Sequence, residues 1–396
     1  MEKMTIRDVD ITGKKVLVRV DFNVPMDPVT GAITDDSRIR ASLPTIKYLL
    51  ERNAKVILLS HLGRPKGKVV ESLRLVPVAR RLADILGQSV DTAPDCVGPA
   101  AEKAAAALKS GGILMLENLR FHPEEEKGDA VFAQALARLG DIYVNDAFGT
   151  SHRAHASMSG ITRYLPAVAG FLLEKEINTL GGLLENPEHP FVALFGGAKV
   201  SDKVAMLKNI MSKVDGLLIG GGMAATFLKA KGYEVGTSQV EADIIDIAAG
   251  LMKAAEKSGS RFLLPVDVMV ANKIDSSAVG RVVSIDAIPS DKMIVDIGTL
   301  TIDLFIRELE KSRTVFWNGP MGVEEIPQFA EGTHALAKLL PHLQAKTIVG
   351  GGSTAEVITK LGLADKITFV STGGGASLEF LGGKALPGVV ALRDKI

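Results

Sequence analysis

The chain is 396 residues long, and its 46 lysines and arginines balance its 46 aspartates and glutamates. A formal net charge of zero argues against a partner that is nucleic acid or an anionic membrane, since proteins that bind these usually carry a basic excess. The single cysteine, Cys96, excludes an intramolecular disulfide and an all-cysteine metal site. No apolar stretch has the length of a signal peptide or a membrane span, so we expect a soluble, cytoplasmic protein.

Short apolar runs alternate with helical patterns along most of the chain. The helical pattern is clear over residues 37–52, where Ile39, Leu43 and Ile46 lie on one apolar stripe. Strands separated by helices predict βαβ units and parallel sheets. The strands are too many for one sheet, so we expect an α/β fold of two doubly wound parallel-sheet domains with a cleft between them. The expected strands are 16–20, 56–59, 113–116, 142–144, 191–195, 217–219, 262–264, 314–316, 347–349 and 367–370.

The boundary between the two domains is expected near residues 165–190. A helix-like stretch over 172–185 is stopped by the proline-containing segment 186–190. We interpret this stretch as an interdomain helix, and the alternative is one more surface helix of a single domain. The expected division is a first domain over 1–170, a helix over 171–187, a second domain over 188–380 and a terminal segment over 381–396.

Glycine is concentrated in the second half, with 13 of the 40 glycines in residues 1–170 and 27 in 171–396. Four strands there are each followed by a glycine turn and then by a helical pattern. Such turns let the backbone approach a ligand closely, and the N–H groups of the next helix attract phosphate. The alternative is that the glycines only fit the turns. The four turns are Gly196-Gly197, Gly220-Gly221-Gly222, Gly350-Gly351-Gly352 and Gly373-Gly374-Gly375.

Two lysines follow the first glycine turn. Lys199 and Lys203 are four residues apart, on one face if a helix begins there, and are candidates to neutralise phosphate oxygens. The chain has no G-x-x-x-x-G-K-[ST] motif. Segments beginning at Gly220 and Gly350 fit the looser G-x-G-x-x-A pattern, but no well-placed acidic strand end follows them. A dinucleotide site is therefore the weaker hypothesis.

The expected strands of the first half end in polar and cationic residues instead. If these strands are parallel neighbours, their ends meet at one edge of the sheet and form a cationic pocket for a small anion. The residues concerned are Asp21, Asn23, His61, Arg64, Arg120 and Arg153.

Arg38 lies in the first turn of a helix that Ser37 is expected to open, where the helix dipole disfavours a cation. Asp35 and Asp36 could compensate for this charge. The alternative is that Arg38 points at an anion bound at that helix terminus, because residues that break a local rule often mark functional sites.

These residues occur in long motifs that resemble the phosphoglycerate kinase family over essentially the whole chain. In the first half the motifs are Arg19-Val20-Asp21-Phe22-Asn23-Val24-Pro25, Ser60-His61-Leu62-Gly63-Arg64-Pro65-Lys66-Gly67, Leu116-Glu117-Asn118-Leu119-Arg120-Phe121 and the segment 145–155. In the second half they are the segment 196–203, Gly220-Gly221-Gly222-Met223, Trp317-Asn318-Gly319-Pro320-Met321-Gly322 and the segment 371–377.

The resemblance implies reversible phosphoryl transfer from 1,3-bisphosphoglycerate to ADP, giving 3-phosphoglycerate and ATP, by direct in-line transfer after hinge closure. It implies Mg²⁺ bound with ADP or ATP, and it implies that the terminal segment over 381–396 packs back on the first domain. We expect a monomer. The first domain would bind the three-carbon acid through Asp21, Asn23, Arg38, His61, Arg64, Arg120 and Arg153. The second would bind Mg-nucleotide through Gly196, Gly197, Lys199, Lys203, Gly220, Gly221, Asn318, Pro320, Glu325, Gly350, Gly351, Gly352 and Ser353, with Gly373 and Gly374 near the phosphates.

Within these sets, catalysis is expected from the groups that would balance the charge of the migrating phosphoryl. No general base is needed, because the reacting oxygens are already ionised, so His61 and His152 are expected to bind or pack. The expected catalytic residues are Arg38, Lys199, Lys203, Gly351 and Gly374.

Two positions depart from the family pattern. Ser353 stands where the family usually has an aspartate that helps to hold the metal, and we expect weaker Mg²⁺ binding from a hydroxyl. Glu324 stands where an aromatic residue usually precedes Glu325, at the edge of the expected nucleoside pocket.

Two other classes of protein compete with this interpretation. A two-lobed protein that binds an anionic metabolite without chemistry would explain the basic pocket, but not the glycine turns with Lys199 and Lys203. A dinucleotide-dependent dehydrogenase would bind NAD and would not interconvert ATP and ADP.

Overall fold

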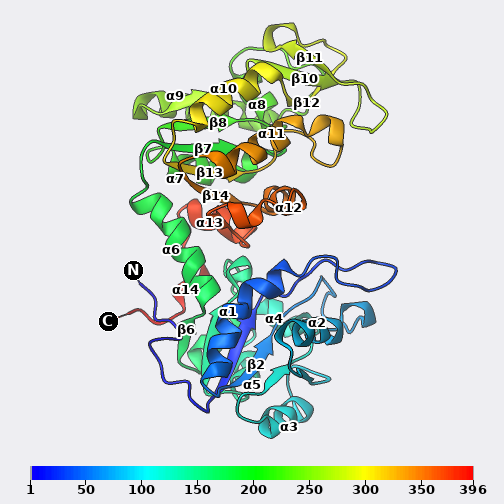
Figure 1. Ribbon diagram of the computed structural model, residues 1–396, viewed down its shortest axis with the longest axis vertical. Helices are drawn as coiled ribbons and strands as arrows, with labels where there is room; N and C mark the ends of the chain where they lie inside the picture. The colour runs from blue at the N-terminus through cyan, green and yellow to red at the C-terminus, as the bar shows by residue number, and fades with distance from the viewer. Residues whose placement is uncertain (1, 396) are drawn as a thin grey trace. The chain divides into compact units, whose positions relative to one another are not determined.

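The computed structural model describes residues 2–395, which form two compact units. Unit 1 comprises the described residues up to Asn178 together with those from Ala385 onward, and unit 2 comprises Thr179–Lys384. The division falls inside helix α6 (Phe171–Glu185), which Figure 1 shows as one continuous helix. No helix among residues 2–395 is long and apolar enough to cross a membrane.

Unit 1 is built on a six-stranded sheet in the order β3-β4-β2-β1-β5-β6, in which every pairing is parallel. The strands are β1 (Lys15–Val20), β2 (Lys55–Leu59), β3 (Asp91–Thr92), β4 (Ile113–Met115), β5 (Ile142–Asp146) and β6 (Ala167–Ala169). The helices of this unit, besides part of α6, are α1 (Ser37–Glu51), α2 (Val76–Leu86), α3 (Pro99–Ala107), α4 (Pro123–Lys127), α5 (Ala130–Ala137) and α14 (Pro387–Val390).

The core of unit 1 follows from the apolar runs. Side chains such as Val16, Val18 and Val56 are fully buried against α1, whose inward face carries Ile39 and Ile46. Side chains alternate between the two faces of a strand, so a strand covered on both faces is apolar throughout. The unit therefore has the buried parallel sheet that the sequence predicts.

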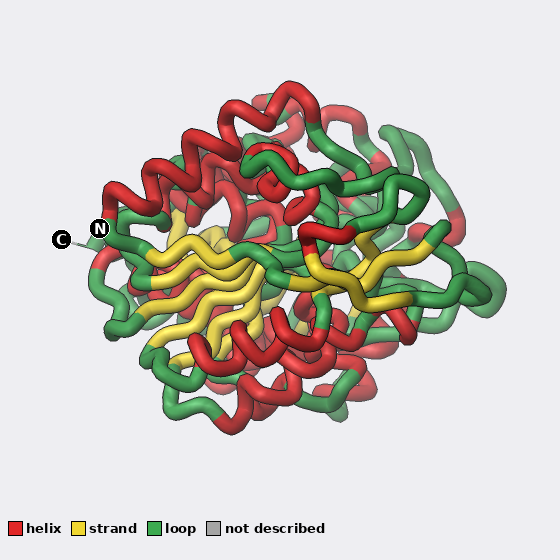
Figure 2. Tube along the Cα trace, turned by 90° about the horizontal axis from the view of Figure 1, so that it is seen from above, coloured by secondary structure: helices red, strands yellow, loops and turns green. Residues whose placement is uncertain are grey.

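Unit 2 repeats this architecture with a second six-stranded parallel sheet, in the order β15-β14-β13-β7-β8-β9. Figure 2 shows helices above and below its strands. The strands are β7 (Phe191–Phe195), β8 (Gly216–Ile219), β9 (Arg261–Leu263), β13 (Thr314–Asn318), β14 (Lys346–Gly350) and β15 (Phe369–Val370). The helices are α7 (Val204–Ile210), α8 (Met223–Ala230), α9 (Ile245–Ser258), α10 (Thr299–Leu309), α11 (Glu331–Leu339), α12 (Gly352–Lys360) and α13 (Gly375–Leu381).

Unit 2 also contains a three-stranded antiparallel sheet that the sequence did not predict. Its order is β11-β10-β12, with β10 at Asp267–Ala271, β11 at Arg281–Ser284 and β12 at Met293–Ile297. The side chains of β11 are mostly exposed, so this edge strand carries no continuous apolar run. The short strands β3 and β6 were not predicted either, because two or three residues are too few to show the alternating pattern of a strand.

The last described residues of the chain pack on unit 1. The Arg393 carbonyl accepts from the Met4 amide at 2.9 Å, and the Asn145 side chain donates to the Gly388 carbonyl at 2.9 Å. Lys3 and Asp394 form an ion pair at 2.7 Å. The two ends of the chain are thereby bound together on the same unit.

Candidate functional site

In unit 1, the carboxyl ends of β1, β2 and β5 lie side by side. Arg19 on β1 is in register with Leu59 on β2 and with Asn145 on β5. The residues that follow these strands therefore emerge at one edge of the sheet, which is where open α/β sheets bind ligands. The predicted parallel pairing of these strands is confirmed.

Arg38 reaches this edge from the first turn of α1. Its Nη1 lies 2.6 Å from Oδ2 of Asp21, the first residue after β1. Burial alone would raise the pKa of Asp21, but the positive charges of Arg38 and Arg19 hold it below its ordinary value. The pair therefore stays ionised, and a third of the Arg38 side chain (35 %) is exposed.

Arg38 does not form its ion pair with the acidic residues next to it in the sequence. Asp36, not Ser37, is the N-cap residue of α1, and it makes no side-chain cap bond. Its carboxylate accepts instead from Arg40 and Arg81, at 2.8 and 2.6 Å. Asp35 accepts from the Ser37 amide at 2.7 Å. The partner of Arg38 comes from the neighbouring strand end.

The side chain of Arg19, on β1 two residues before Asp21, is fully buried. Its Nη2 donates to Nδ1 of His61 at 3.2 Å, and its Nε donates to the Ser157 hydroxyl at 2.9 Å. A guanidinium has no acceptor, so Nδ1 of His61 is the unprotonated nitrogen. Burial, opposed by Asp21 and reinforced by Arg19, Arg120 and Arg38, lowers the pKa of His61 well below its ordinary value. The imidazole is neutral and offers Nε2–H as a donor.

Arg120 and Asn23 are both tied to the turn at Gly63. Nη1 of Arg120 donates to the Gly63 carbonyl at 2.9 Å, and the Gly63 amide donates to Oδ1 of Asn23 at 2.8 Å. Arg120 also pairs with Glu126 at 3.4 Å. Burial, together with the charges of Arg19 and Arg153, lowers the pKa of Arg120. Arg120 is therefore held in place at the edge before any ligand arrives.

Arg153 and Arg64 complete the predicted set with exposed side chains. Arg153 is close enough for its charge to lower the pKa values of Arg120 and His155. Arg64 follows β2 by five residues, and within residues 2–395 no hydrogen bond or ion pair described above joins it to the other members. The structure thus brings Asp21, Arg38, His61 and Arg120 together, with Arg153 near them and Arg64 at the rim of the β2 turn.

Arg19, Glu125 and Ser157 were not among the predicted site residues. Glu125 is completely buried, and its carboxylate accepts from the amide and hydroxyl of Ser157 at 2.9 and 2.5 Å. Burial raises the pKa of Glu125 in spite of the nearby Arg19. One signal was available, because Arg19 is a charged residue inside an apolar strand, where charges are rare unless they are paired. For Glu125 the sequence held no such signal, because a run of three glutamates is typical of a solvent-exposed helix face.

In unit 2, the first two glycine turns pack against the residues that follow β13. A Cβ on Gly196 would lie 2.0 Å from the Pro320 carbonyl oxygen, and one on Gly319 would lie 2.3 Å from that of Gly196. The amide of the second glycine in each turn is already used, since Gly197 donates to Pro320 and Gly221 to Met321, each at 2.8 Å. Gly196 and Gly220 likewise donate to Asn318 and Phe195. These glycines allow the strand ends to approach one another.

Lys203 is buried beside this junction, with 8 % of the residue exposed. Its Nζ donates to Oδ1 of Asn318 at 2.6 Å, while Nδ2 of Asn318 is buried without a hydrogen-bond partner. Burial lowers the pKa of Lys203 to about 8, against a small opposing effect of Asp202. Nδ2 of Asn318 and Nζ of Lys203 are thus two neighbouring donors, and the first has no acceptor. A phosphate or ribose oxygen of a ligand could be that acceptor.

The third and fourth glycine turns lie at the starts of α12 and α13. Gly351 (φ +91°) is the N-cap residue of α12, and Gly374 (φ +50°) is that of α13. A Cβ on Gly352 or Gly374 would meet nothing within 4 Å, so these two glycines border open space. The Gly373 amide already donates to the Ser371 hydroxyl at 3.1 Å, and Gly350 is buried at the end of β14.

The remaining predicted residues of unit 2 lie at the surface. Lys199, Glu325 and Ser353 are exposed, and Pro320 is half-buried. Ser353 is the second residue of α12, next to Thr354, whose hydroxyl accepts from the Gly319 amide at 2.7 Å. Burial raises the pKa of Glu324, and the carboxylates of Glu325 and Glu356 add to this against Lys360. The extra carboxylate at position 324 therefore sits in an acidic surrounding.

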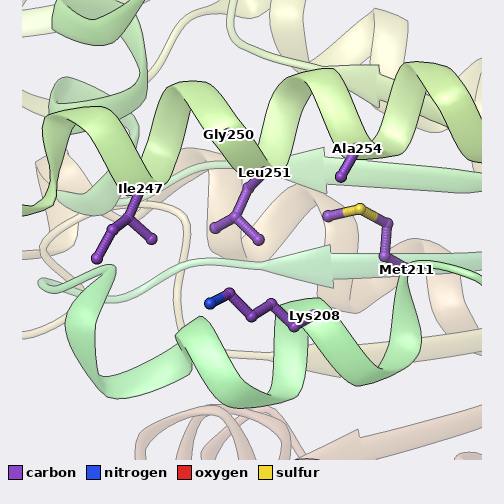
Figure 3. A pocket seen from close by; sticks show the side chains of 6 residues that line it. All are labelled: Lys208, Met211, Ile247, Gly250, Leu251 and Ala254. Carbon is purple, nitrogen blue, oxygen red and sulfur yellow. The ribbon is translucent and has the colours of Figure 1, made fainter.

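A groove of about 240 Å³ between α7 and α9 contains none of these residues. Figure 3 shows Ile247, Leu251 and Ala254 of α9 facing Lys208 and Met211. Its lining is mainly apolar, and it lies apart from the glycine turns in the sequence.

Comparisons with known proteins agree with this geometry. A sequence profile of the family described as phosphoglycerate kinase matches residues 6–384. Phosphoglycerate kinases of Moorella thermoacetica and Pelotomaculum thermopropionicum are 58 % and 55 % identical to this chain, each over the full length of both sequences. The solved structure of phosphoglycerate kinase from Coxiella burnetii has a TM-score of 0.88 at 41 % identity, covering 99 % of this chain and 100 % of that one.

The chain therefore belongs to the phosphoglycerate kinase family. Its activity is the phosphotransfer of glycolysis between 1,3-bisphosphoglycerate and ADP. The family identification leaves no place for the dehydrogenase or for a binding protein without chemistry.

Proposed function

We propose that unit 1 binds the phosphoglycerate and unit 2 binds the nucleotide with Mg²⁺. The observation that carries this division is the difference between the two strand edges. The edge in unit 1 gathers guanidinium groups around a neutral imidazole donor, a combination suited to a compact carboxylate and phosphate. The edge in unit 2 combines one buried amine with two helix starts that border open space, a combination suited to a diphosphate.

For the acid, we assign binding to Asp21, Asn23, Arg38, His61, Arg64, Arg120 and Arg153. Arg19 is assigned as a positioning residue, because it holds the His61 ring from below through Nδ1 and is itself fixed by Ser157. In this assignment Asp21 orients Arg38, and the exposed part of the Arg38 side chain remains available to the ligand.

For the nucleotide, we assign the cationic contacts to Lys199 and Lys203 and the polar contacts to Asn318, Glu325 and Ser353. Gly351, Gly352 and Gly374 are assigned to the phosphates, because the starts of α12 and α13 leave amides without intrahelical partners. Gly196, Gly197, Gly220, Gly221, Pro320 and Gly350 are assigned to shaping the site through their backbone packing.

The chemistry needs little covalent help. A terminal phosphate oxygen of ADP attacks the phosphorus of the acyl phosphate, and the bond from that phosphorus to the carboxyl oxygen breaks. The products are ATP and the carboxylate of 3-phosphoglycerate, and no proton has to be removed from the attacking oxygen. Arg38 and the cations of unit 2 would balance the charge of the migrating group, and the neutral His61 would donate rather than act as a base. Direct transfer requires that the two units bring their substrates together.

Mg²⁺ would neutralise charge on the nucleotide phosphates. The residues present fit a weakly held ion, because Ser353 offers one neutral oxygen where Mg²⁺ commonly has a carboxylate. The phosphate oxygens of the nucleotide would therefore supply more ligands to the ion than the protein does. We further propose that the enzyme is cytoplasmic, because its substrates are soluble metabolites, and that it acts as a monomer, because both substrates are assigned to units of one chain.

A coupled assay for ATP formation from ADP and 1,3-bisphosphoglycerate tests the proposal. Wild-type protein should form ATP, and the rate should fall when either Arg38 or Lys203 is replaced. Binding of 3-phosphoglycerate without formation of ATP would contradict it.

A further inference from the structure

Unit 1 carries a cluster of metal-ligating side chains that phosphoryl transfer does not use. Asp95 and Cys96 lie in the loop between β3 and α3, and His122 joins the short helical turn Leu119–Phe121 to α4. One ligand atom from each of the three residues lies within 4.8 Å of the other two. The chain has no other cysteine.

The three groups are already ordered toward one another. Oδ1 of Asp95 lies 2.7 Å from Nε2 of His122 and accepts from the Cys96 amide at 2.6 Å. The His122 ring packs against the Phe132 ring with centroids 5.2 Å apart, which limits its rotation. Cys96 is fully buried, whereas 29 % of the His122 side chain and 45 % of the Asp95 side chain are exposed. The cluster is therefore open to solvent on one side and closed on the side of the thiol.

We propose that Asp95, Cys96 and His122 bind a borderline-soft divalent ion of the Zn²⁺ class, with water in the fourth position. Tetrahedral Zn²⁺ with bonds of about 2.0 to 2.3 Å places its ligand atoms roughly 3.5 Å apart, so the cluster closes on the ion by small side-chain rotations. A thiolate–imidazole–carboxylate set favours Zn²⁺ and Co²⁺ over Mg²⁺, which prefers oxygen ligands. The site is thus distinct in chemistry from the Mg-nucleotide site.

Binding would convert the Cys96 thiol to a thiolate, with its proton released to the solvent as the sulfur–metal bond forms. The bound ion would link the β3–α3 loop to the segment that carries Arg120, and this linkage would stabilise unit 1.

Titration of tag-free protein with Co²⁺ tests the site, because cobalt bound to thiolate gives a near-ultraviolet charge-transfer band and Cys96 is the only thiol. We expect this band at one Co²⁺ per chain, its loss on addition of Zn²⁺, and a higher melting temperature with Zn²⁺. Cys96→Ser and Cys96→Ala should lose the band, while His122→Gln and Asp95→Asn should weaken Co²⁺ binding at least about tenfold.

The matched control is His189→Gln, which disrupts a histidine–aspartate pair of the same 2.7 Å separation, His189 with Asp215, that has no cysteine. This variant should bind Co²⁺ like the wild type. Absence of the band in wild-type protein would overturn the proposal, as would equal Co²⁺ affinity in wild type, His122→Gln and Asp95→Asn. The melting temperature of each variant without metal shows whether it is folded.

Discussion

Arg38 and Asp21 form a 2.6 Å ion pair between the first turn of a helix and the end of the neighbouring strand. The pair explains how a cation is tolerated where the helix dipole disfavours one by some tenths of a kcal/mol. Asp21 is buried more deeply than Arg38, with 12 % of its side chain exposed against 35 %. The guanidinium is therefore anchored on one side and accessible on the other, as a group that must meet a migrating charge would be.

Replacing Arg38 with alanine should lower turnover by on the order of a hundredfold or more, because it removes a donor aimed at transition-state charge. The matched control is Arg40→Ala, which removes an exposed cation from the same helix turn, one that forms an ion pair with Asp36. Steady-state rates of ATP formation measure both. Near wild-type turnover in Arg38→Ala would remove Arg38 from the catalytic assignment.

Lys203 should make nucleotide binding sensitive to pH. Burial lowers its pKa from 10.5 to about 8, so its charge is present below pH 8 and is lost as the pH rises further. ADP affinity measured by calorimetry should therefore fall by up to about tenfold per unit above pH 8. The free energy of unfolding should change in the opposite direction. Folding disfavours the charged amine of Lys203, so the protein gains stability as the pH rises from 8 to 10.5 and this penalty disappears.

Lys203→Met should bind ADP more weakly and without that inflection. Lys199→Ala is the control, because it removes an exposed lysine four positions earlier and should weaken binding while the inflection remains. An inflection that persists in Lys203→Met would assign it to another group.

Gly319→Ala should destabilise unit 2 more than Gly232→Ala. Both glycines have positive φ, +97° and +96°, so both alanines bear the same backbone strain. A Cβ at position 319 would also lie 2.3 Å from the Gly196 oxygen, whereas one at position 232 would meet nothing within 4 Å. The difference should be about 1 to 3 kcal/mol in denaturant unfolding. Equal effects would mean that the glycine turns do not pack as described.

Ser353→Asp should tighten the apparent affinity for Mg-nucleotide several-fold, because a carboxylate replaces a neutral oxygen near the phosphates. Ser353→Asn is the control, since it has nearly the same shape without the charge. The Mg²⁺ dependence of the rate measures both variants. An unchanged or weaker dependence in Ser353→Asp would contradict the account of this departure.

The sheets could be predicted because their strands are covered on both faces and so appear as unbroken apolar runs, such as Phe191–Phe195. The antiparallel sheet was not predicted: its edge strand β11 is mostly exposed, and the apolar residues of β10 and β12 were not recognised as strands. Which polar strand ends meet in unit 1 also followed from the sequence, since parallel pairing places Asp21 and His61 at the same edge.

Long-range partners could not be predicted in the same way. The sequence offered Asp35 and Asp36 as neighbours of Arg38, but its partner is Asp21, which follows β1 and lies 17 residues away in the sequence. The glycine turns at Gly196 and Gly221 follow strands just as those at Gly351 and Gly374 do. Only the structure shows that the first two contact backbone and that Gly374 borders open space.

The division of the substrates between the units is tested most directly by measuring KM for both substrates in two variants. Arg153→Ala should raise the KM for 3-phosphoglycerate about tenfold or more and leave that for ATP within about twofold, and Lys203→Met should do the reverse. If each variant raised both KM values equally, or if the two effects were exchanged, the assignment of one substrate to each unit would be wrong.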